Sequence, residues 1–398
     1  MALVANSWRR LMSAIWTDTD NNEEESETPP SLLRLPPEII ISIASMLPAQ
    51  SAANLALCCR QLGQILGPKS WKSLRRAPHD DRFEFLSTLA KDLPQFLPCR
   101  NCLLLHHISA IKWPREISYA RGPPCTSEGS PATYRHLYGS FYEIHYPQIQ
   151  LAMRQHRDGI DIGFPLEAFR YLEVWQGEGS PWKVVLSSAN AQIVSDEFIV
   201  RFQIWTLVPW NRSDTFVEEL EKYNLWYNIC AHNRRAGRRD ESTVTTLMIS
   251  RVRQLEKAEK NRQTRTFQCP YCYMEYMVDA KDFGERGLAV ITTKWVNLGA
   301  GREIPDAKWK SHRDRYGDRD RREINQTDEH RRSLREDFEN QAELSLEDLT
   351  ADNEKKLFST RKPQAVTRAL DGCVWRWRYG TRWYLDYSGS TPSIWENW

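Results

Sequence analysis

One helix predicted near the start of the chain is apolar around most of its circumference, over residues 35–47, LPPEIIISIASML. Pro36 and Pro37 suit the first turn of a helix, where a missing N–H donor costs nothing, and the Leu47–Pro48 step ends it. A surface helix of a globular protein needs an apolar stripe over only about 100°. We therefore expect this helix to carry more apolar surface than one neighbouring element can cover.

A second apolar helix is predicted directly after the first. Ser51 can cap this helix, and its stripe is formed by Leu55, Cys58 or Cys59, Leu62 and Leu66. Two short helices cannot bury this much apolar surface against each other. Either the rest of the chain or a separate partner has to cover the remainder.

The stretch from Leu33 to about Trp71 closely resembles an F-box. The residues that match the family pattern, in order, are Leu35, Pro36, Glu38, Ile39, Ile43, Leu47, Leu55, Leu57, Cys59, Arg60 and Leu62. Ala52 departs from it, because a larger apolar residue is expected there. The resemblance extends to residues 85–107 and 269–299, which are similar to segments of fungal F-box proteins, but it names no substrate.

The resemblance implies a partner for the uncovered apolar surface. F-box domains bind the Skp adaptor, which connects to a cullin and a ubiquitin-conjugating enzyme. The residues implied to contact Skp are Leu35, Pro36, Glu38, Ile39, Ile43, Leu47, Leu55, Cys59 and Leu62. The expected function is therefore that of a non-catalytic substrate adaptor, which recruits a protein target for ubiquitination.

Paired cysteines predict a metal site. The chain has nine cysteines and shows no secretory signal peptide, so a reducing compartment is expected, where such pairs suggest metal before disulfide. Two C-x2-C units, Cys99 with Cys102 and Cys269 with Cys272, can aim four thiolates at one ion. We predict a structural Zn²⁺ at these four residues.

Rival ligand sets remain open at this point. Cys230 and His232 could join Cys269 and Cys272, while His106 or His107 could join Cys99 and Cys102. All four cysteines of the paired units could also be reduced, buried residues without a metal. A catalytic zinc site has less support, because the sequence contains no H-E-x-x-H motif.

The remaining patterns predict an α+β protein, in which a three-helix F-box precedes a mainly antiparallel β domain with flanking helices and the zinc site. In EFIVRFQIWTLV, Phe198, Val200, Phe202 and Ile204 alternate with a mixed face, which predicts a well-covered strand. The expected segments are an N-terminal helix and acidic linker (1–30), the F-box (31–76), a substrate-binding α+β domain with the C-x2-C units (77–300), a charged helical or disordered insertion that buries little (301–362) and an aromatic hairpin (363–398).

Composition and motifs narrow the classes of function. The formal net charge is +2, from 54 basic and 52 acidic residues, so there is no general attraction to nucleic acid or membranes. No apolar run approaches the roughly 18 residues of a membrane span, and the motifs of kinases, P-loop proteins and serine hydrolases are missing. An intracellular protein, cytoplasmic or nuclear, is expected. The alternative is a zinc-stabilised nucleic-acid-binding or structural interaction protein.

Overall fold

The computed structural model describes residues 31–100, 102–111, 114, 133–135, 142–159, 161–175, 184–208, 266–302, 307–312, 332–358, 373–378 and 382–387. The predicted N-terminal helix and acidic linker (1–30), Cys230 and His232 lie outside these residues. The chain divides into two compact units, Met1–His106 and His107–Trp398. Among the helices described, none is long and apolar enough to span a membrane.

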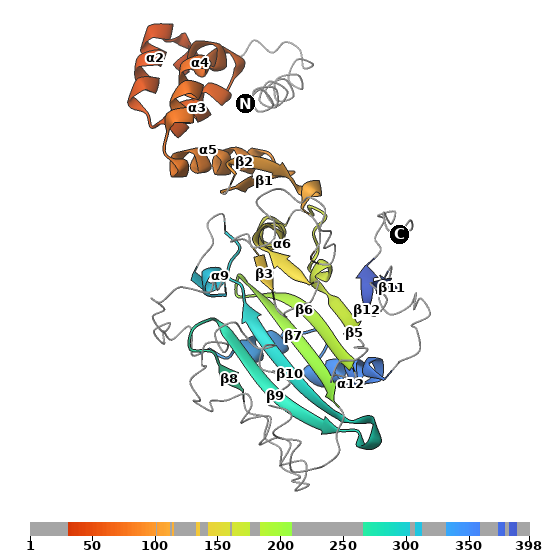
Figure 1. Cartoon of the computed structure of the whole chain (residues 1–398). Coiled ribbons are helices and arrows are strands. Elements are labelled where there is room, and N and C mark those ends of the chain that lie inside the picture. Colours follow the sequence, from red (N-terminus) through yellow and green to blue (C-terminus); the bar gives the residue numbers. More distant parts are fainter. Residues whose placement is uncertain are drawn as a thin grey trace. The chain divides into compact units, whose positions relative to one another are not determined.

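The first unit is a set of short helices followed by a small hairpin (Figure 1). Its elements are η1 (Ser31–Arg34), α2 (Pro37–Met46), α3 (Ala49–Leu57), α4 (Arg60–Arg76), α5 (His79–Asp92), β1 (Phe96–Cys99) and β2 (Leu104–His107). The prediction of one continuous helix after Ser51 was wrong, because the chain breaks at Cys58 and Cys59. Cys59 is fully extended and its sulfur accepts a hydrogen bond from the Leu62 amide, so it caps α4.

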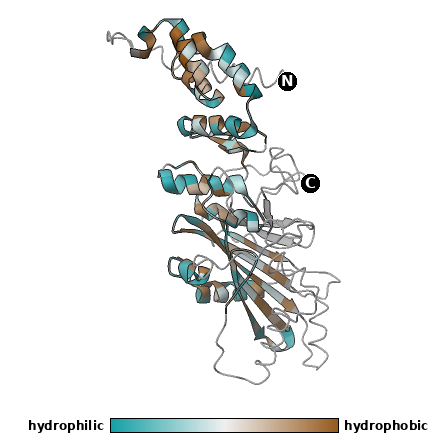
Figure 2. Cartoon of the chain, turned by 90° about the vertical axis from the view of Figure 1, so that its left-hand side faces the viewer, coloured by the Kyte–Doolittle hydropathy of each residue, from teal (hydrophilic) through white to brown (hydrophobic). Residues whose placement is uncertain are grey.

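The core of the first unit has two parts. In Figure 2, hydrophobic residues are brown, and they recur along the helices of this unit. One part joins α2, α3 and α4 through Ile40, Ala44, Ala56, Leu62 and Leu66. The other joins α3 and α4 to α5 through Ala53, Leu74, Phe85, Leu86 and Leu89. The compact unit therefore extends past residue 76, and α5 belongs with the helices before it.

The second unit is built on an antiparallel sheet of eight strands, in the order β11-β12-β5-β6-β7-β10-β9-β8. Its strands are β5 (Tyr171–Trp175), β6 (Val184–Val194), β7 (Glu197–Val208), β8 (Phe267–Gln268), β9 (Met274–Asp282), β10 (Leu288–Asn297), β11 (Cys373–Arg378) and β12 (Arg382–Tyr387). The C-terminal hairpin β11–β12 joins this sheet by pairing β12 with β5. Helices followed by an antiparallel sheet give an α+β fold.

Smaller elements surround this sheet. They are η2 (Ile108–Ala110), β3 (Thr133–Arg135), β4 (Glu143–His145), α6 (Tyr146–Asp158), η4 (Leu166–Phe169), η7 (Gly284–Arg286), α9 (Ala307–Ser311), α11 (Leu334–Glu339) and α12 (Leu346–Leu357). Strands β3 and β4 form a separate two-stranded sheet. Helix α12 lies against the large sheet in Figure 1.

Strand β7 is buried on both faces, as its sequence predicts. On the apolar face, Phe202 packs edge-on against Tyr142, and Phe198 packs against Phe169. On the mixed face, Trp205 is fully buried in a cluster that includes Leu357 of α12. Helices therefore cover the polar positions of this strand as well as its apolar ones.

The charged segment after residue 301 buries more than its composition suggests, which corrects the expectation that it buries little. Phe338 of α11 and Leu357 of α12 are 0% and 1% exposed. Phe338 packs with Trp295 of β10 in a core cluster that also holds Leu346. The apolar residues of the segment are few, but helical spacing places them on one side, towards the sheet.

Candidate functional site

Helix α2 turns a row of large apolar side chains outward. Pro36 is its N-cap, and inside the helix Ile40 and Ala44 are buried. The outward row is 47% exposed at Ile39, 37% at Ile43 and 86% at Met46. Leu35 and Leu47, which flank the helix, are also exposed. We call these five residues, Leu35, Ile39, Ile43, Met46 and Leu47, the apolar row.

The apolar row is unusual for a surface that stays in water. Single exposed apolar side chains are normal, whereas a contiguous group of large ones marks an interaction site. Ile39, Ile43 and Met46 follow the i, i+4, i+7 spacing that brings side chains to one side of a helix. The row therefore offers an apolar strip along one whole side of α2.

A second candidate site lies at the β1–β2 turn. The Cys99 and Cys102 sulfurs and one ring nitrogen of His106 all lie within 4.8 Å of one another, and the Cys102 sulfur is 3.1 Å from His106 Nε2. The Leu103 amide donates to the Cys99 carbonyl at 2.9 Å, which closes the turn. All three side chains are half-buried.

Two contacts fix this turn to α5. The Arg100 guanidinium forms an ion pair with Asp80 in the first turn of α5, and it lies 5.3 Å above the Phe83 ring.

Hydrogen bonds to the Cys102 and Cys99 sulfurs raise the pKa of His106 to about 9, against an opposing effect of burial. Thiol and imidazole groups that share protons in this way are also the donor set that zinc prefers.

The other cysteine pair lies in the second unit, at the turn between β8 and β9. Cys269 and Cys272 are buried, at 1% and 0% exposure. The Cys269 amide donates to the Met274 carbonyl, and the Met274 amide donates to the Cys272 carbonyl, so the turn runs directly into a strand. The structure thus brings Cys99 and Cys102 together with His106, while the predicted four-cysteine set draws two residues from each unit.

A family model described as F-box-like matches residues 32–77. The chain carries an F-box-like domain. The matched residues run from η1 to the end of α4, so the domain comprises the three helices α2, α3 and α4. Neither a curated protein nor a solved structure matches the chain.

The residues implied to contact Skp fall into three groups within the F-box-like domain. Leu35, Pro36, Glu38, Ile39, Ile43 and Leu47 are exposed. Leu55 and Cys59 are half-buried. Leu62 is 4% exposed and packs in the core of the domain itself.

Met46 was not among the predicted contacts. Its exposure of 86% is far greater than that of the other exposed apolar side chains of α2. The signal that could have found it is the spacing of seven residues from Ile39, which places both side chains on one side of a helix. The family pattern does not include it, so it was missed.

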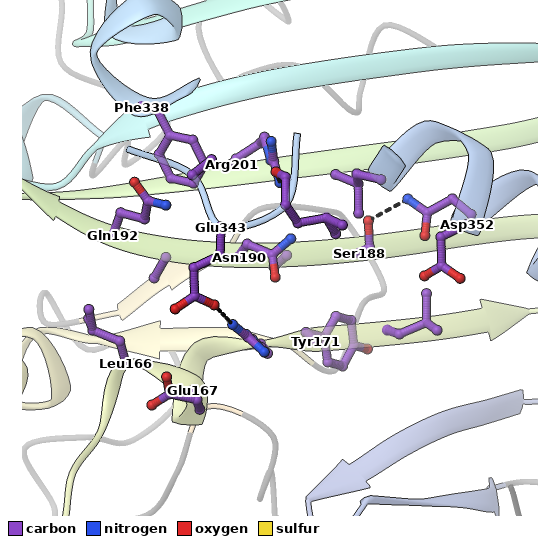
Figure 3. A pocket seen from close by; sticks show the side chains of 18 of the residues that line it. Leu166, Glu167, Tyr171, Ser188, Asn190, Gln192, Arg201, Phe338, Glu343 and Asp352 are labelled. Carbon is purple, nitrogen blue, oxygen red and sulfur yellow. Dashed lines mark hydrogen bonds and ion pairs between the residues drawn. The ribbon is translucent and has the colours of Figure 1, made fainter. Parts of the chain in front are cut away.

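Outside the F-box-like domain, the second unit has an open pocket of about 600 Å³. Figure 3 shows side chains from η4, β6 and the helices after residue 332 around it. Arg170 and Glu343 form an ion pair across it at 2.7 Å, and Asn353 donates to the Ser188 hydroxyl at 2.8 Å. A concave site with a few converging polar groups is typical of ligand-binding sites.

Proposed function

We propose that this protein is a substrate adaptor of a Skp–cullin–F-box ubiquitin ligase. The observation that carries the proposal is the apolar row on the outer side of α2, within residues that match the F-box-like model. Skp would cover this row, and the second unit would hold the target protein. The proposed role places the protein in the cytoplasm or the nucleus, where such ligases work.

The apolar row has the composition of an interface centre. Binding energy at protein interfaces is concentrated in a few large, fully desolvated side chains. Moving a large apolar side chain from full exposure to full burial contributes about 1.5–3 kcal/mol. Met46, at 86% exposure, would therefore contribute most, and Ile39 and Ile43, which are already partly covered, would each contribute less. The exposed Pro36 and Glu38 would lie at the rim of the same interface.

An adaptor of this kind does no bond chemistry itself. It holds its target close to the conjugating enzyme, and so raises the effective concentration of the target's lysine residues there. The ligase then depends on two surfaces of the chain, one for Skp and one for the target. The first is assigned to α2 of the F-box-like domain.

The test of the Skp surface is Ile39→Asp. Because Ile39 is 47% exposed, the variant should fold normally, but in the complex it would leave an unpaired carboxylate in a dry interface. Such a charge costs about 3–5 kcal/mol, so the Kd for Skp should rise by at least about 100-fold. Ser45→Asp is the matched control, because it adds the same charge to the same helix at an exposed position outside the row.

Calorimetry or a pull-down with purified Skp reads the result. Equal binding by the folded Ile39→Asp variant and the wild type would overturn the proposal. If the wild type instead bound polynucleotides with a steep dependence on salt, the zinc-stabilised nucleic-acid-binding protein would become the better reading.

We infer that the open pocket of the second unit takes part in holding the target. Asn190 lines it from β6, so Asn190→Trp should fill the pocket. Glu285→Trp is the matched control, since Glu285 is exposed in η7 and does not line the pocket. Affinity purification followed by mass spectrometry should show that Asn190→Trp retains Skp and loses other bound proteins. Unchanged recovery of those proteins would exclude the pocket.

Structural zinc is also part of this proposal. The four-cysteine set predicted from the sequence, Cys99, Cys102, Cys269 and Cys272, stays a prediction, and its rival is a separate site at each pair. Cys269 and Cys272 have the turn-into-strand backbone expected of a zinc knuckle. Loss of zinc from the Cys272→Ser variant would therefore show that this second pair, Cys269 and Cys272, holds metal.

A further inference from the structure

The β1–β2 turn gathers donors of the kind that zinc uses. Cys99 is the last residue of β1, Cys102 lies in the turn, and His106 lies in β2. Bonds of about 2.3 Å in a tetrahedral site place sulfur donors about 3.7 Å apart. The three donor atoms here already lie within 4.8 Å of one another, so closing on an ion needs shifts of only about 1 Å.

We propose that Cys99, Cys102 and His106 bind one Zn²⁺, separately from Cys269 and Cys272. The metal would replace the protons that the two thiols and the imidazole now share. His107 is not part of this converging group, because it follows His106 directly in β2 and successive side chains of a strand point to opposite faces. The sequence left the choice between His106 and His107 open, and the direction of these two side chains decides it.

The backbone of the turn holds the two sulfurs near each other before any metal binds. Leu103 has a φ of 53°, which places a leucine in the left-handed region. For a residue other than glycine this conformation is unfavourable, and it persists where the surrounding structure enforces it. The Leu103 amide reaches back to the Cys99 carbonyl, and the Leu103 side chain packs against the core around Phe85.

The site would stabilise the unit that contains the F-box-like domain. Leu103 and Leu105 pack on the same cluster as Ala53 of α3 and Leu74 of α4. Arg100, between the two cysteines, is fastened to Asp80 of α5. A metal that locks the hairpin therefore also supports α5, which packs against α3 and α4 of the F-box-like domain.

Three protein ligands leave one tetrahedral position of the ion. Within the described residues, the group consists of Cys99, Cys102 and His106. A water molecule or another exogenous ligand would occupy the fourth position. The proposal concerns the three residues that converge, and its test is independent of the fourth ligand.

Metal content of the purified, reduced full-length protein is the primary measurement. Cys102→Ser and His106→Ala should each lower the bound zinc by one equivalent, whatever the second pair holds. His107→Ala and Cys58→Ser are the matched controls, one a neighbouring histidine and the other an exposed free cysteine, and both should retain all the zinc. His106→Cys should restore the lost equivalent, because thiolate is also a zinc ligand.

Cobalt substitution separates this site from the four-cysteine alternative. The absorption of Co²⁺ reports on the donors, so Cys99 and Cys102 with His106 should give a spectrum that loses intensity in Cys99→Ser and keeps that component in Cys269→Ser. Full metal content in His106→Ala, together with loss in Cys269→Ser, would overturn the proposal in favour of four thiolates. Absence of metal from a folded, reduced wild type would also overturn it.

Discussion

The ion pair between Arg201 and Glu339 allows a sharp test of the fold, because it joins β7 to the charged segment. The Arg201 side chain is 1% exposed and Glu339 is 18% exposed, with 2.7 Å between Nη1 and Oε2. Glu339 also accepts a hydrogen bond from the indole of Trp295 at 2.8 Å. Burial lowers the pKa of Arg201, and the nearby Glu339 carboxylate opposes this effect.

Glu339→Ala should strongly destabilise the second unit. Removing one partner of a buried pair leaves the other charge uncompensated, which costs about 3–5 kcal/mol. The partial exposure of Glu339, and the remaining hydrogen bond from Arg201 to the Leu344 carbonyl, favour the lower end, about 3 kcal/mol. With a urea m-value of about 3 kcal/mol/M, the unfolding midpoint should fall by about 1 M.

The control for this change lies four residues along the chain. Glu343→Ala removes the partner of Arg170, whose pair is far more exposed, at 32% and 79%. An exposed pair contributes about 0–1 kcal/mol, so the midpoint should barely move. Urea unfolding followed by far-UV circular dichroism compares the two variants. Equal, small shifts would refute the placement of α11 against the sheet.

Three further changes follow from the structure. Phe338→Ala should lower the free energy of unfolding by about 3–5 kcal/mol, measured by urea titration, because the ring is fully buried; a loss below about 1 kcal/mol would contradict that burial. Gly301→Ala should lower the melting temperature, since Gly301 has a φ of +57° and an added Cβ would meet Met153 at 2.8 Å; an unchanged calorimetric midpoint would count against it. Zinc affinity at Cys102 and His106 should fall as the pH is lowered, because protons compete for the same atoms; competition with a chelator at several pH values measures this, and a flat profile would argue against these ligands.

Local patterns in the sequence predicted the parts of the fold that depend on near neighbours. Alternation identified β7 and its two buried faces. The order of apolar residues after Leu35 indicated the F-box, which the match to residues 32–77 confirms. The break at Cys58 and Cys59 was missed, because a cysteine N-cap acts through a weak sulfur acceptor and leaves the apolar spacing of the stripe unchanged.

Partners distant in the sequence could not be predicted. Arg201 looked like a polar position on a strand, and its partner Glu339 lies 138 residues away among many other charges. The density of charge around α11 and α12 concealed a small number of apolar positions, such as Phe338 and Leu357. The same holds for the metal ligands, because spacing permitted several sets and the direction of each side chain selects among them.

The exposure of Met46 and its neighbours has a consequence for the life of the chain before it meets a partner. A newly made molecule exposes the apolar row, which is the kind of surface that chaperones and degradation systems recognise. It stays exposed to them until a partner covers the row. A partner that binds only the native state, and is present at 100 times its Kd, adds about 2.7 kcal/mol to the stability of the protein. Under the proposed function, the amount of this protein in a cell should therefore follow the supply of free Skp, and overproduction alone should yield aggregates where joint production with Skp yields a soluble complex.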